Sequence, residues 1–196
     1  MADPIQHEPA PTAVLWGVLV LLAVIGVAIV FLTAPGAALL GPHQQAIRGA
    51  LHGTAAGLFM ITSTVGLFQA YQIFAGRAWN LSELQLGSVI NAALALLTII
   101  SGNWLYIPYR APEGPRSHFL QSAPEIHKVF FEFKEFAALF TFPLAVVAAY
   151  LLVRYGRELH ERRGLSTVIA ALLVLVFFYF VVAFGLGAAI TKLKAI

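Results

Sequence analysis

Histidines are the residues of this chain with the widest chemical range, and four of the six lie beside long apolar segments. His52 and His127 each stand at the start of such a segment, and His43 and His118 lie in the polar stretches just ahead. Neutral imidazole is a common metal ligand, and two histidines on facing helices can hold a b-type haem between them. We therefore take His52 and His127 as candidate metal and haem ligands.

The residues after His52 favour the close approach of a flat group. Gly53 and Gly57 are four residues apart, so one face of a helix through them carries no side chains at these positions. Such a face suits a haem ring, and it suits the packing of a second helix equally well. The chain has no Glu-x-x-His pair and no His-Glu-x-x-His motif, which argues against a di-iron site and a zinc protease.

A second chemically rich segment is EIHKVFFEFKE, residues 125–135, which has six ionisable side chains in eleven residues. At 100° per residue, a helix places His127, Phe131 and Lys134 on one face. One interpretation makes this segment the solvated end of a long helix. The other places its charged groups inside the bundle, where ionisable residues are costly and usually functional. In that case Lys134 is a candidate partner for a haem propionate.

Five apolar segments must position these residues, and each exceeds the roughly 18–20 residues that a helix needs to span a bilayer. They cover residues 13–33, 51–75, 86–107, 126–153 and 167–190. None alternates in polarity as a spanning strand does. We predict an all-α integral membrane protein, a single domain over residues 1–196 built as a bundle of five transmembrane helices.

The segments between the apolar runs indicate the orientation and the local structure. The stretch RYGRELHERR, residues 154–163, carries four arginines, and such an excess is typical of cytoplasmic loops. This predicts a cytoplasmic N-terminus, with His52 and His127 toward the outer face. The stretch at 108–125 contains four prolines, so we expect it to be extended rather than helical. The second apolar helix is expected to begin early, from about Gln44.

Composition supports a membrane protein and excludes several classes of function. The chain is 60% hydrophobic and 11% charged, so it has far more apolar surface than a domain of this size can bury. It contains no cysteine, which excludes iron–sulfur clusters ligated by cysteine and covalent attachment of haem through Cys-x-x-Cys-His. The net charge of +3 is spread over loops, so no basic surface for nucleic acid is expected.

Three functional interpretations remain, and a bundle of this kind is loosely similar to small membrane cytochromes b. The first is a non-catalytic subunit of a respiratory or photosynthetic electron-transfer complex, with one b-type haem near the outer face. The second is a cofactor-free accessory subunit of such a complex. The third, a transporter or a membrane enzyme with an outer metal site, lacks a deep carboxylate relay. The expected partners are lipid, other membrane subunits and a periplasmic electron carrier, in the bacterial inner membrane.

Overall fold

The computed structural model describes residues 41–77 and 80–193, together with isolated positions between 19 and 38. The described part of the chain is helical and contains no strand. Four of its helices are long and apolar enough to cross a membrane. They are α3 (Gln44–Phe74), α4 (Leu81–Tyr109), α6 (Glu132–Tyr155) with the turns that flank it, and α7 (Arg163–Leu193). The first predicted span, residues 13–33, lies outside the described residues apart from isolated positions.

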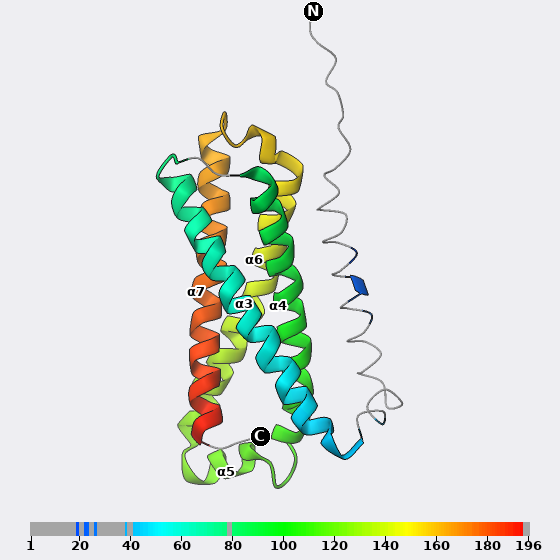
Figure 1. The fold of residues 1–196 in the computed structure, drawn as a ribbon. Coiled ribbons are helices and arrows are strands. Elements are labelled where there is room, and N and C mark those ends of the chain that lie inside the picture. Colours follow the sequence, from blue (N-terminus) through cyan, green and yellow to red (C-terminus); the bar gives the residue numbers. More distant parts are fainter. Residues whose placement is uncertain are drawn as a thin grey trace, which may run out of the picture.

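The four long helices form an antiparallel bundle (Figure 1). The short helix α5 (Pro115–Ser122) lies across one end, which we call the α5 end. α3 begins at this end, α4 returns to it, α6 leaves it and α7 returns again. The arginine-rich stretch at 154–163 lies at the opposite end, around η3 (Gly156–Glu158).

Local sequence signals explain where these helices begin and end. α3 begins at Gln44 as predicted, after the single turn η1 (Gly41–His43). Beyond its C-terminus Gly76 has φ +63°, a left-handed conformation that glycine adopts without strain. The α4 helix starts at Asn80, whose side-chain oxygen accepts hydrogen bonds from the backbone N–H groups of Ser82 (3.0 Å) and Glu83 (3.5 Å).

The prediction of an extended stretch at residues 108–125 was wrong, because this stretch contains α5. Pro115 is the first residue of α5, a position at which proline loses no helical hydrogen bond. Pro124 follows the helix and does not interrupt it. A segment with four prolines can therefore contain a short helix. The position of each proline relative to the helix ends decides whether the helix can form.

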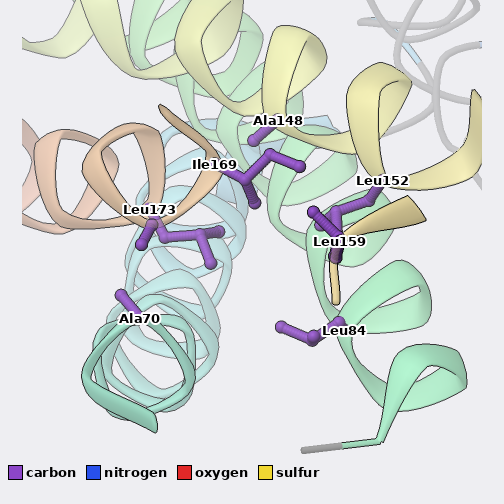
Figure 2. Packing of buried hydrophobic residues seen from close by; sticks show 8 residues of the cluster. Ala70, Leu84, Ala148, Leu152, Leu159, Ile169 and Leu173 are labelled. Carbon is purple, nitrogen blue, oxygen red and sulfur yellow. The ribbon is translucent and has the colours of Figure 1, made fainter. Parts of the chain in front are cut away.

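Small side chains allow the long helices to pack closely. Figure 2 shows the buried cluster at the opposite end, where side chains from α3, α4, α6 and α7 meet; its members are Ala70, Leu84, Ala148, Leu152, Leu159, Ile169, Ala170 and Leu173. Nearer the middle, the rings of Phe59 and Phe180 lie 4.1 Å apart between alanines of α3, α4 and α6. Because lipid gives helices little hydrophobic reason to associate, such close contact is what holds a membrane bundle together.

Candidate functional site

The structure brings the three predicted site residues, His52, His127 and Lys134, to the α5 end of the bundle. His52 lies in the third turn of α3, and Lys134 lies in the first turn of α6. His127 belongs to η2 (Ile126–Phe131), a wide π-helical turn that leads directly into α6. His118 lies in α5 itself, and its side chain is exposed.

His52 is held against α4 by Ser101 and by the backbone of Thr98. Its Nδ1 lies 3.1 Å from Oγ of Ser101 on α4. The Ser101 hydroxyl directs its only proton to backbone carbonyls, at 2.7 Å from that of Leu97 and 3.2 Å from that of Thr98. With its proton directed there, the serine oxygen is the acceptor toward His52, and this assigns the proton of the neutral ring to Nδ1. In the neutral ring Nε2 then holds the lone pair, which is available to a metal or a proton.

A glycine on α4 makes room for the His52 ring. A Cβ atom at Gly102 would lie 3.2 Å from the ring carbon Cε1, closer than ordinary van der Waals contact. The absence of a side chain at this position lets α3 and α4 approach with the imidazole between them. Ser101 and Gly102 thus determine together how close the His52 ring lies to α4 and how the ring is oriented.

His127 is fixed through both ring nitrogens, and only 4% of its surface is exposed. The Arg116 Nε–H group of α5 donates to His127 Nε2 over 3.1 Å. The lone pair is therefore on Nε2, and in the neutral ring Nδ1–H donates to the Tyr109 hydroxyl, 3.0 Å away. His127 thus joins α4, α5 and η2 in one hydrogen-bonded network.

Aromatic packing supports this network. The rings of Tyr109 and Phe131 stack 4.2 Å apart with an angle of 6° between their planes, and Tyr106 stacks on both. Phe119 of α5 and Ile190 of α7 complete the buried cluster. α5 is therefore held to the bundle by one buried aromatic side chain and by the bond from Arg116 to His127.

Lys134 points toward the bundle rather than into solvent. Its ammonium lies 4.3 Å from the centre of the Phe131 ring, a cation–π contact, and its Cδ packs against Gly187 of α7. It is close enough to His52 to act on that ring electrostatically. No carboxylate of a described residue lies within 4 Å of its ammonium. Lys134 is therefore a half-buried cation beside a ring, a glycine and a histidine, and the carboxylate of Glu135 also acts on it electrostatically.

The three residues predicted to share one face are shielded in the structure, although a π-helical turn replaces the regular α-helix on which that prediction was based. Neither interpretation describes the segment fully. His127 and Phe131 are buried and Lys134 is half-buried, whereas Lys128 and Glu132 are exposed. One side of the segment therefore faces the bundle and α5, and the other faces outward.

The two histidines do not share a partner in this structure. His52 is bonded to α4, and His127 is bonded to α4 and α5 through different residues. For His127 to ligate a haem iron together with His52, it would have to give up at least one of its two hydrogen bonds. Among the described residues, no group of three or more His, Asp or Glu side chains is arranged to hold a metal ion.

Sequence reasoning missed the partners that fix these side chains, namely Ser101, Gly102, Tyr109 and Arg116. The Tyr109 hydroxyl contacts His127, and the Tyr109 side chain is fully buried. Ser101 and Gly102 lie at the same level of the bundle as His52, because α3 and α4 run antiparallel and lie side by side. That pairing, which the short connection between the two apolar runs implies, is the signal that could have identified them.

The interior of the bundle between its two ends is uncharged. Residues 53–76, 84–109, 136–153 and 164–191 contain no Asp, Glu, Lys, Arg or His. Polar side chains there are neutral, such as Gln85, whose amide donates to the Leu152 carbonyl over 3.0 Å. The Asp, Glu, Lys, Arg and His residues of the four described long helices are therefore confined to the helix ends.

Comparison with protein-family models, with curated proteins and with solved structures finds no match to this chain. The function must therefore be argued from the side chains and their geometry.

Proposed function

We propose that this chain is an integral membrane subunit of a larger electron-transfer complex, and that it binds one b-type haem through His52. The observation that carries the proposal is the fixed imidazole of His52. Its Nδ1–H group is anchored on Ser101, which leaves the Nε2 lone pair for iron. A bound haem would supply a one-electron carrier.

Two residues of the α5 end fit a haem, and one does not as it stands. His52 has a ring nitrogen, Nε2, for which no hydrogen bond to a described residue is seen, and Lys134 offers an ammonium to a propionate. His127 has both nitrogens engaged, so it does not fit the second axial position without releasing Tyr109 or Arg116. The proposal therefore rests on His52 as the ligand from this chain, with His127 in the supporting network.

The second candidate is a cofactor-free accessory subunit of a membrane complex. The network of His127 favours it, because a histidine that bridges Tyr109 and Arg116 has a sufficient structural role without any cofactor. Transport is disfavoured for the described helices, since their uncharged interior offers no relay for ions or protons.

A visible absorption spectrum of the protein purified from its native membrane, oxidised and then reduced, tests the proposal. A b-type haem gives a sharpened α band and a shifted Soret band on reduction. We expect His52→Ala to lose this signal and His127→Ala to retain it. Loss in both variants would instead favour ligation by the pair, and a featureless wild-type spectrum would favour the cofactor-free subunit.

We further propose that the α5 end faces the periplasm in the bacterial inner membrane and that the N-terminus is cytoplasmic. The four arginines at 154–163, at the opposite end of the bundle, support this orientation. Other membrane subunits, lipid and a periplasmic electron carrier are then the expected partners. Because the chain lacks cysteine, single cysteines placed at Glu113 and Arg157 would report the orientation by their labelling from outside the cell. Labelling at Arg157 alone would reverse it.

A further inference from the structure

Two hydrogen-bond donors near the start of α3 have no acceptor among the described residues. They are the side-chain amide nitrogen Nε2 of Gln45 and the guanidinium Nε of Arg48, and both atoms are shielded from solvent. They lie three residues apart on α3, so they are neighbours on one face of the helix. A buried donor without an acceptor is costly, and here two lie side by side.

The described residues also provide no counter-ion for the positive charge at this position. The first turn of α3 contains no acidic residue, and no side chain caps the helix. No carboxylate of a described residue lies within 4 Å of Arg48, whose guanidinium instead lies 5.8 Å from the centre of the Trp104 ring. The positive end of the helix dipole adds to the same field. The Arg48 side chain is only half-buried, so part of the guanidinium can be reached from outside.

We propose that Gln45 and Arg48 form a binding site for a phosphate group at the α5 end of the bundle. Both unpaired groups are donors, so the ligand must supply acceptor oxygens, and the unpaired guanidinium requires it to be anionic. A guanidinium fork matches a phosphate through two parallel hydrogen bonds. Because α3 is long and apolar enough to cross a membrane and Gln45 and Arg48 lie in its first two turns, a lipid headgroup is one source of the phosphate and the aqueous phase is the other. This site is separate from His52 and does not depend on haem.

The test uses the full-length protein in detergent, with native mass spectrometry and thermal unfolding as readouts. The probes are phosphatidylglycerol, a diacylglycerol with the same acyl chains and no phosphate, and inorganic phosphate. We expect phosphatidylglycerol to bind and stabilise, and Arg48→Gln to weaken its binding by about tenfold or more, since a charge-assisted hydrogen bond is lost. Arg110→Gln is the matched control, because Arg110 is exposed at the same end and lies 5.2 Å from the centre of the Tyr106 ring.

The outcomes separate the sources and can overturn the site. Binding of phosphatidylglycerol without an effect of inorganic phosphate assigns a lipid headgroup, and equal stabilisation by inorganic phosphate assigns the free ion. If diacylglycerol stabilises as well as phosphatidylglycerol, or if Arg110→Gln weakens binding as much as Arg48→Gln, the site does not exist. Gln45→Glu serves if Arg48→Gln fails to fold, since the new carboxylate should pair with Arg48 and abolish binding; retained binding would overturn the proposal.

Discussion

The tight turn between α4 and α5 gives the sharpest test of how α5 is held. A Cβ atom at Gly114 would lie 2.5 Å from the backbone oxygen of Pro108, 2.6 Å from that of Tyr109 and 3.0 Å from that of Ala111. All three contacts are with backbone, so no side chain can rotate to relieve them. Gly114→Ala must therefore open the turn and displace the start of α5.

The size of the effect follows from the two ways in which the chain can respond. Overpacking against a backbone typically costs about 1–3 kcal/mol. If α5 lifts instead, Phe119, which is 3% exposed, loses a burial worth roughly 2–3 kcal/mol. We therefore expect Gly114→Ala to cost about 2–3 kcal/mol, which for a chain of this size lowers Tm by about 5–10 °C.

Thermal unfolding in detergent and limited trypsin digestion measure this change. Cleavage after Arg116 should accelerate in Gly114→Ala, since Arg116 is held by its bond to His127 in the wild type. Gly164→Ala in α7 is the control, because a Cβ atom there meets nothing within 4 Å and alanine favours a helix. If Gly114→Ala unfolds at the wild-type temperature and is cut no faster, the described turn is incorrect.

Three further substitutions test other parts of the structure. Arg116→Gln removes the donor to His127. Amide hydrogen exchange in α5 should therefore accelerate, while Tm falls by only a few degrees. Unchanged exchange in α5 would show that this hydrogen bond does not hold α5 in place. Asn91→Leu replaces a buried amide whose oxygen has no partner, and it should leave stability unchanged or raise it by about 1 kcal/mol in denaturant unfolding. A clear loss of stability would mean that this oxygen is bonded to a water or a ligand. Gly156→Ala would place a Cβ atom 2.5 Å from Cδ1 of Leu81. Because this atom is the movable end of a side chain, Gly156→Ala should lower Tm less than Gly114→Ala does. An equal fall in Tm would contradict this ranking.

The helices could be predicted from sequence because their signals are local. Long apolar runs mark the four described spans, and the start of α3 at Gln44 follows from the residues beside it. The burial of Phe131 and Lys134 on one side of the charged segment agrees with α-helical spacing, whereas the position of His127 depends on the wide turn of η2, which α-helical spacing does not predict.

The site could be predicted only in part, because its contacts join residues that are distant along the chain. Tyr109 and Arg116 lie 18 and 11 residues before His127, and the intervening turn decides whether they meet. That turn includes α5, whose prolines are compatible with more than one backbone path. Sequence reasoning could therefore name His127 but could not show that both of its nitrogens are occupied.

The wide turn of η2 changes the direction in which the start of the third described span faces. In this turn the backbone N–H of Glu132 bonds to the carbonyl of His127, five residues back instead of four. Everything before it is therefore rotated by about 100° relative to a continuous α-helix. The residues before the turn can therefore face α5 while the rest of the helix faces α4 and α7. The one extra residue in the turn sets the angle between these two faces. Deleting a single residue within 128–130 would leave His127 and Arg116 in the sequence, but it would turn the His127 side chain away from Arg116.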